Sequence, residues 1–136
     1  MKIAICLDFN SFTESMLAAV HNIAGEMKKA EITVIHIIDL SLFYGTSSFE
    51  EELIDDLREN SKTLKEMCIH QLGPDVKYIE ETGLPTMQVD ETLKQIDYDL
   101  LVIGKHSKSV LGARLLGGLA QRLLHNSTKP ILIIPD

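Results

Sequence analysis

The chain of 136 residues is long enough to bury the core of one domain and too short for two ordinary domains. It has 45% hydrophobic residues and no tryptophan, so aliphatic side chains must supply most of the buried surface. No segment approaches the roughly 18 consecutive apolar residues of a membrane-spanning helix, and the apolar run after Lys2 is too short for a secretory signal. We therefore expect one domain over residues 1–136, located in the cytoplasm and without a membrane partner.

The formal net charge of −7 is unevenly distributed along the chain. Residues 1–100 hold eight basic and nineteen acidic side chains, whereas residues 101–136 hold five basic and one acidic. Binding to a nucleic-acid backbone usually requires a broad basic face, so we expect no nucleic-acid partner. The local excess of positive charge near the C-terminus instead suits a small anionic ligand.

The first predicted unit consists of a strand, a turn and a helix. A strand is predicted over residues 2–7, because the apolar run after Lys2 is typical of a strand buried on both faces, and Asp8 ends it. Ser11 and Glu14 have the spacing of a capping box, in which the serine side chain accepts from the Glu14 N–H and the glutamate reaches back. Apolar residues at helical spacing over 16–27 then predict one buried helix face.

The second unit contains the longest predicted helix. Residues 32–38 form its strand, and Ser48 with Glu51 repeats the capping-box spacing. Apolar residues then recur in steps of three or four as far as Leu72, and Gly73 with the proline after it closes the helix. The amino-terminal half of this helix is strongly acidic, which we interpret as a solvent-facing surface favoured by the helix dipole rather than as a metal site.

The remaining elements continue the same alternation. Strands are predicted over 76–79, 100–103 and 131–134, with helices over 85–96 and 119–124 between them. Prolines on both sides of the last strand confine it to an edge or a terminus of the sheet.

Regular alternation of strands and helices predicts a three-layer α/β domain, in which a five-stranded parallel sheet carries helices on both faces. In such sheets ligands bind at the carboxyl ends of the strands, where the strand order reverses. Asp8, Ile37 and Gly104 all lie at predicted carboxyl ends. We therefore expect these three residues to share one crevice.

The loop from Gly104 to Gly118 differs from an ordinary connection. It contains no acidic residue, and it carries glycines, cations and hydroxyls: Gly112, Gly117, Lys105, Lys108, Arg114, Ser107 and Ser109. Between the end of a strand and the start of a helix, free backbone N–H groups and the helix dipole favour an anion. The same glycines also fit a simpler interpretation, in which they only turn the chain and cap the helix, and the motif does not decide between the two.

This loop resembles the carboxyl-terminal signature of the universal stress protein family, which is a glycine, two residues, a glycine, nine residues, and then a glycine followed by serine or threonine. The corresponding positions are Gly104, Ser107, Gly117 and Gly118, so two of the four match. The resemblance implies a fold of the adenine nucleotide alpha hydrolase-like, Rossmann-like type. It extends along the chain through Asp8-Phe9-Asn10, His36-Ile37 and Gly83-Leu84-Pro85.

In members of the family that bind ATP the signature holds the phosphates, so the resemblance implies ATP or AMP as the ligand. It also implies that Asp8 approaches the ribose or adenine end and that the backbone of Ile37 reads the adenine edge. From the residues alone, Asp8 equally fits a turn residue that bonds nearby amides. The resemblance implies these nucleotide-binding residues: Asp8, Ile37, Gly104, Lys105, Ser107, Ser109, Gly117 and Gly118.

Two departures from the signature predict weak binding. Ser107 replaces a glycine, and its side chain hinders a close approach of the backbone. Gly118 replaces a hydroxyl residue, which removes one hydrogen bond to a charged group at a cost of about 1.5–3 kcal/mol.

The sequence does not support catalysis. The histidines show no paired spacing for a metal, and Ser107 and Ser109 lack a local base, so we expect no catalytic and no metal-binding residue. We expect a regulatory or binding module that is not an enzyme, and weak hydrolysis of ATP is kept as an alternative. The alternatives are a dimeric stress-response scaffold that binds no nucleotide and a Mg²⁺-dependent phosphoryl-transfer enzyme that uses the same loop.

The last strand suggests self-association. A strand at a sheet edge exposes unpaired backbone groups to which a second copy can bond. The family resemblance implies a homodimer joined through Ile131, Leu132, Ile133 and Ile134. In the alternative interpretation, this edge strand is only short and protected by its prolines, and it does not pair with a second copy.

Overall fold

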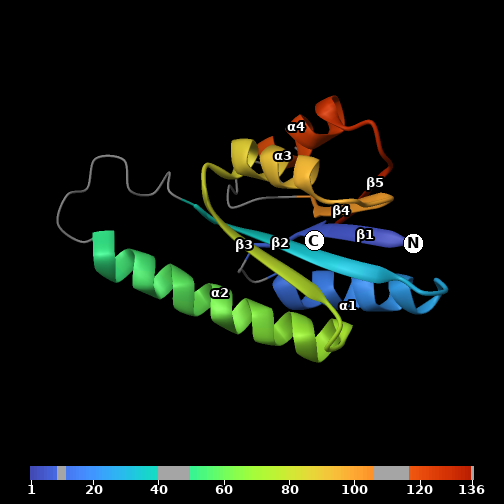
Figure 1. Cartoon of the computed structure of the whole chain (residues 1–136), viewed down its shortest axis with the longest axis horizontal. Coiled ribbons are helices and arrows are strands. Elements are labelled where there is room, and N and C mark those ends of the chain that lie inside the picture. Colours follow the sequence, from blue (N-terminus) through green and yellow to red (C-terminus); the bar gives the residue numbers. More distant parts are fainter. Residues whose placement is uncertain (9–11, 40–49, 106–116, 136) are drawn as a thin grey trace.

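The computed structural model describes residues 1–8, 12–39, 50–105 and 117–135. Strands and helices alternate along these residues (Figure 1). The strands are β1 (Lys2–Cys6), β2 (Glu31–Asp39), β3 (Lys77–Gly83), β4 (Leu100–Gly104) and β5 (Ile131–Ile134). The helices are α1 (Thr13–Gly25), α2 (Glu50–Leu72), α3 (Pro85–Gln95) and α4 (Gly118–Asn126).

The five strands form one parallel sheet in the order β3-β2-β1-β4-β5. α1 and α2 cover one face of the sheet, and α3 and α4 cover the other (Figure 1). This arrangement confirms the predicted three-layer α/β fold, and β5 lies at an edge, as its flanking prolines predict. The chain steps outward from β1 to β3 and then returns to the other side of β1 with β4, so the strand order reverses between β1 and β4.

The central strand β1 explains why the chain begins with a continuous apolar run. Ile3, Ile5 and Leu7 pack in the core beneath α1 and α2, whereas Ala4 and Cys6 pack in the core beneath α3 and α4. None of these five residues is more than 9% exposed. Since side chains alternate between the faces of a strand, a strand covered on both faces must be apolar at every position.

β3 is longer than its apolar run predicts. It continues to Gly83 because its backbone pairs with β2 from the Thr33–Lys77 pair to the Asp39–Gly83 pair. Backbone hydrogen bonds do not require apolar side chains, and at the edge of the sheet Glu80 and Glu81 reach solvent. Apolar periodicity alone therefore underestimates this strand.

The helix ends agree in part with the predicted caps. α1 begins at Thr13 with Phe12 in the N-cap position, and the Phe12 side chain forms no cap hydrogen bond. Ser11 and Ser48 themselves lie outside the described residues. Gly73 ends α2 as predicted, and its φ of 100° is the left-handed conformation that glycine adopts without strain.

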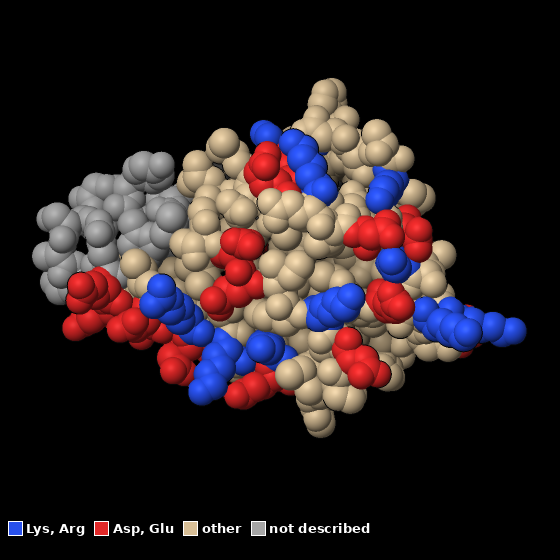
Figure 2. All heavy atoms as spheres, in the orientation of Figure 1, with Lys and Arg blue, Asp and Glu red and all other residues tan. Residues whose placement is uncertain are grey.

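The acidic face of α2 points toward solvent. Figure 2 shows acidic side chains gathered over the amino-terminal half of this helix. The residues concerned are all exposed: Glu51, Glu52, Asp55, Asp56 and Glu59. Within the described ranges, no three His, Cys, Asp or Glu side chains are grouped so that they could hold a metal ion.

Among the helices of the described residues, none combines the length and the apolar character needed to cross a bilayer.

Candidate functional site

A hollow opens at the carboxyl edge of the sheet, where the strand order reverses between β1 and β4. Its volume is about 580 Å³, including the part that is open to solvent. The enclosed space that a water-sized sphere can occupy is about 50 Å³, and the position is the one at which doubly wound sheets bind ligands. Residues from β1, α1, β4 and α4 line it, among them Asp8, Phe12, Thr13, Gly104, Leu119 and Ala120.

The amino ends of two helices converge on this hollow. Thr13 is the first residue of α1, and Leu119 and Ala120 belong to the first turn of α4. Neither helix has a side-chain cap at its N-cap residue. Since the helix dipole is positive at this end, the hollow favours a negatively charged group.

Two amides of the predicted anion loop are engaged within the protein. The Lys105 N–H donates to the Ile134 carbonyl at 3.0 Å, and the Gly117 N–H donates to the Lys105 carbonyl, also at 3.0 Å. Gly118 is the exposed first residue of α4, and the residues of this helix that line the hollow are the two that follow it. Ser107 and Ser109 lie outside the described residues.

Asp8 follows β1 and lines the hollow together with Gly104. The Thr13 hydroxyl donates to the Asp8 backbone carbonyl at 2.6 Å, and this bond ties the end of β1 to the start of α1. The tie holds Asp8 beside the amino end of α1, where a carboxylate is stabilised by the helix dipole.

Ile37 lies on β2, on the other side of β1 from β4, and it is not among the residues that line the hollow. Its side chain is buried in the core beneath α3 and α4. The ladder between β1 and β2 ends near this residue, since the last backbone bond that joins these strands runs from the Leu7 N–H to the Ile35 carbonyl at 3.0 Å. The structure therefore brings Asp8 and Gly104 together and leaves Ile37 one strand away.

Several lining residues escape prediction from the sequence. The hollow is also lined by residues near the start of α1 and by one residue after β5: Phe12, Thr13, Ser15, Met16 and Pro135. The signal for the α1 residues was present, because the first turn of a helix that follows a strand must begin at the carboxyl edge of the sheet. Pro135 joins the site through the pairing of β5 with β4, which the sequence does not specify.

The chemistry of the described lining residues favours binding over reaction. Burial raises the pKa of the Cys6 thiol from 9.0 to about 12, so this thiol is neutral near pH 7 and is a poor nucleophile. Among the described residues that line the hollow, Asp8 is the one carboxylate.

Comparisons with known proteins agree with this architecture. A family model described as the universal stress protein family matches residues 1–135. Universal stress protein MJ0531 of Methanocaldococcus jannaschii is 32% identical over 128 residues, which cover 88% of this chain and 74% of the relative. Universal stress protein MJ0577 of the same organism is 27% identical over 152 aligned positions, which cover 98% of this chain and 93% of the relative.

Solved structures extend the comparison. The structure of MJ0577 matches this chain with a TM-score of 0.80 and covers 99% of this chain and 95% of its own. The fold is shared by a universal stress protein in complex with cAMP, with a TM-score of 0.61, 16% identity, and coverage of 99% and 96% of the two chains. It is also shared by the universal stress protein from Archaeoglobus fulgidus in complex with dAMP, with a TM-score of 0.62, 16% identity, and coverage of 98% and 97%. From the match of the family model over residues 1–135, this chain belongs to the universal stress protein family.

Proposed function

We propose that this protein is a dimeric binding module that holds an adenine mononucleotide weakly in the hollow between β1 and β4. The observation that carries the proposal is the convergence of two helix amino ends beside Asp8. It is supported by two relatives of the same fold, one in complex with cAMP and one in complex with dAMP.

The phosphate is expected at the start of α4. The amides of Gly118, Leu119 and Ala120 belong to the first turn of this helix and point away from its body. One helical turn suits a single phosphate group, and the amides of Lys105 and Gly117 are already bonded to carbonyls of the protein. For these reasons AMP fits the site better than ATP.

The remainder of the nucleotide is expected to cross the end of β1. In this pose the Asp8 carboxylate accepts a hydrogen bond from a ribose hydroxyl. The base then reaches the peptide group of Ile37, whose N–H and C=O complement the N1 acceptor and the amino donor of adenine. Gly118 offers no hydroxyl to the phosphate, which keeps the affinity about ten- to a hundredfold below that of a site with one.

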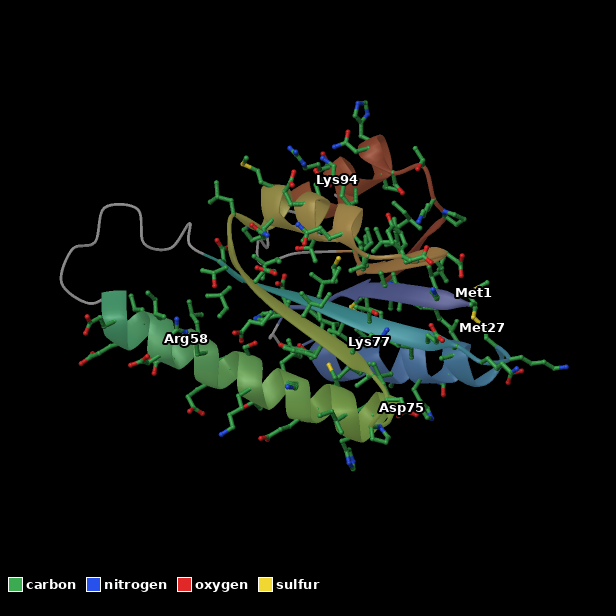
Figure 3. The ribbon with its side chains drawn as sticks, viewed as in Figure 1. Met1, Met27, Arg58, Asp75, Lys77 and Lys94 are labelled. Atoms are coloured by element: carbon green, nitrogen blue, oxygen red, sulfur yellow. The ribbon has the colours of Figure 1, made fainter. Side chains whose placement is uncertain are left out.

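Calorimetric titration with AMP tests the site when the wild-type protein is compared with Asp8→Asn. The substitution keeps the shape of the side chain and removes its charge, so we expect Kd to rise about tenfold. The matched control is Asp75→Asn, since Asp75 is an exposed aspartate in the turn between α2 and β3, as Figure 3 shows. If all three proteins bind AMP with equal affinity, Asp8 does not contribute to the site.

A second measurement concerns what the protein carries after purification. Small molecules released by heating the protein can be identified by their mass. An adenine mononucleotide in this fraction would support the proposal. If the wild-type protein carries no nucleotide and does not bind AMP in the titration, the proposal of a nucleotide site is wrong.

We propose that two copies associate through β5. This strand lies at the edge of the sheet, and its residues Ile131–Ile134 are all only partly buried in the single chain. An edge of this kind can pair with its own copy around a twofold axis.

A second candidate function is a dimeric scaffold that binds no nucleotide. The bonds of Lys105 and Gly117 to carbonyls of the protein favour it, because they show that part of the loop has a structural role. The two candidates differ in one result: a scaffold remains dimeric and gives no heat with AMP.

A further inference from the structure

We propose that His36 is a positioning residue that ends the pairing of β1 with β2 and thereby keeps the backbone N–H of Ile37 open to a ligand. The proposal rests on the proposed nucleotide site, because the ligand it serves is the adenine base. The effect of His36 on strand pairing is argued from the hydrogen bonds between β1 and β2.

The ladder between β1 and β2 stops one step before Ile37. The strands pair from Lys2–Glu31 to Cys6–Ile35, and the Leu7 N–H then donates to the Ile35 carbonyl at 3.0 Å. In a parallel ladder every second residue of a strand bonds to the same neighbour. The next bond of this ladder would therefore run from the Ile37 N–H to the Leu7 carbonyl.

The ring of His36 bonds to this carbonyl oxygen. Its Nδ1 lies 2.8 Å from the Leu7 carbonyl oxygen, and both residues are buried. A carbonyl oxygen only accepts, so Nδ1 must carry the proton and donate. Between the described residues Leu7 and Ile37, no backbone hydrogen bond is formed.

The side chain of His36 reaches this carbonyl because of its place on the strand. Side chains alternate along β2, so His36 lies on the same face of the sheet as Val34, and Leu7 packs in the core on that face. The ring therefore bonds to the carbonyl from the side, whereas a backbone donor would bond within the plane of the sheet. The Ile37 N–H, which faces β1, is left without a backbone bond to Leu7.

Two variants distinguish the effect of the hydrogen bond from His36 to Leu7 from the effect of the size of the His36 side chain. Asparagine carries its amide nitrogen at the position that corresponds to Nδ1, so His36→Asn can keep the bond to Leu7. His36→Leu has a similar size and no donor. In His36→Leu the Leu7 carbonyl is expected to accept the Ile37 N–H instead, because a buried carbonyl rarely remains without a partner.

Amide hydrogen exchange measured by NMR without nucleotide tests the positioning role. In the wild-type protein the Ile37 amide should exchange at least about tenfold faster than the Ile35 amide, which belongs to the paired part of the same strand. His36→Leu should slow Ile37 by a similar factor, and His36→Asn should exchange like the wild type. Equal protection of Ile35 and Ile37 in the wild-type protein would overturn the proposal, even if His36→Leu did not fold.

Titration of the same three proteins with AMP tests the consequence for the ligand. We expect His36→Leu to bind AMP about tenfold more weakly than the wild type and His36→Asn to bind it equally well. If His36→Leu closes the ladder and still binds AMP like the wild type, the base does not use the Ile37 amide and the proposal is wrong. If the wild-type protein does not bind AMP, the proposed function fails, and the exchange rates alone decide the effect of His36 on the strands.

Discussion

The hydroxyl of Tyr78 donates to the backbone carbonyl of Ser61 at 3.1 Å and lies 2.9 Å from the Ser61 hydroxyl oxygen. These two bonds join β3 to the middle of α2. Ser61 is 1% exposed and is the first buried residue of the helix among those described, whereas the preceding turns are largely exposed. The pair therefore marks the point at which α2 meets the sheet.

Replacement of Tyr78 by phenylalanine removes both bonds and keeps the packing of the ring. We expect Tyr78→Phe to lower the free energy of unfolding by about 1–2 kcal/mol, measured by urea denaturation. Ser61→Ala should cost less, since the Tyr78 hydroxyl can still donate to the carbonyl of residue 61. A larger loss in Ser61→Ala than in Tyr78→Phe would contradict this account of the contact.

Buried thiols make the protein sensitive to alkaline pH. Burial raises the pKa of Cys68 from 9.0 to about 11 and that of Cys6 to about 12, because it disfavours the thiolate. Each folded-state pKa exceeds its unfolded value, so the stabilisation is complete below about pH 8.5 and is lost as the pH rises toward 11 and 12. The free energy of unfolding should then fall by at most about 1.4 kcal/mol per pH unit for each group.

Denaturation curves of Cys68→Ala between pH 9.0 and 11 check this expectation. The variant should be less stable than the wild type near pH 7 because it loses buried volume, yet its stability should depend less steeply on pH. Parallel curves for the two proteins across this window would show that the Cys68 thiol does not contribute.

A hydroxyl at the start of α4 should strengthen the nucleotide site. A Cβ added at Gly118 meets no atom of the described residues within 4 Å, so serine is a suitable replacement. We expect Gly118→Ser to lower the Kd for AMP about tenfold, because it adds a hydrogen bond to the charged phosphate. Calorimetric titration measures the change.

Gly25 provides a matched control for Gly118. It also meets no atom within 4 Å of an added side chain, and it lies at the carboxyl end of α1, away from the end that lines the hollow. Gly25→Ser should leave the Kd unchanged. An affinity that does not increase in Gly118→Ser would argue against phosphate at the start of α4.

The outward-facing backbone of β5 can be altered without removing a bond to β4. Leu101 and Lys105 donate to the carbonyls of Pro130 and Ile134, so the alternating peptide groups of Ile131 and Ile133 point away from β4. Ile133→Pro removes one outward donor. We expect this variant to be monomeric in sedimentation velocity experiments at concentrations where the wild type is a dimer.

Two further variants control for the loss of the Ile133 side chain and for damage to the fold. Ile133→Ala loses the same packing and keeps the backbone donor, so it should remain dimeric. Leu132→Pro alters a residue whose backbone faces β4 and should lower stability in addition. If Ile133→Pro remains dimeric, the copies do not associate through this edge.

Apolar patterns located most of the elements because both faces of the sheet are covered. Runs such as residues 3–7 and 131–134 are then continuously apolar, and Asp8 or a proline marks where they end. The pattern was least informative at β3, where Glu80 and Glu81 pair through the backbone. It was also uninformative at the start of α1, where Phe12 occupies the N-cap position.

The alternation of strands and helices, the edge position of β5 and the residues that end the strands can be read from the amino-acid sequence, because burial on both faces dictates which positions are apolar. The contacts within the site, in contrast, depend on how the chain folds. Folding joins Gly117 to Lys105, brings the amino ends of α1 and α4 to one hollow, and places the His36 ring on the Leu7 carbonyl. A hydrogen bond depends on where two atoms distant in the sequence come to lie, and periodicity reports only which face of an element is buried.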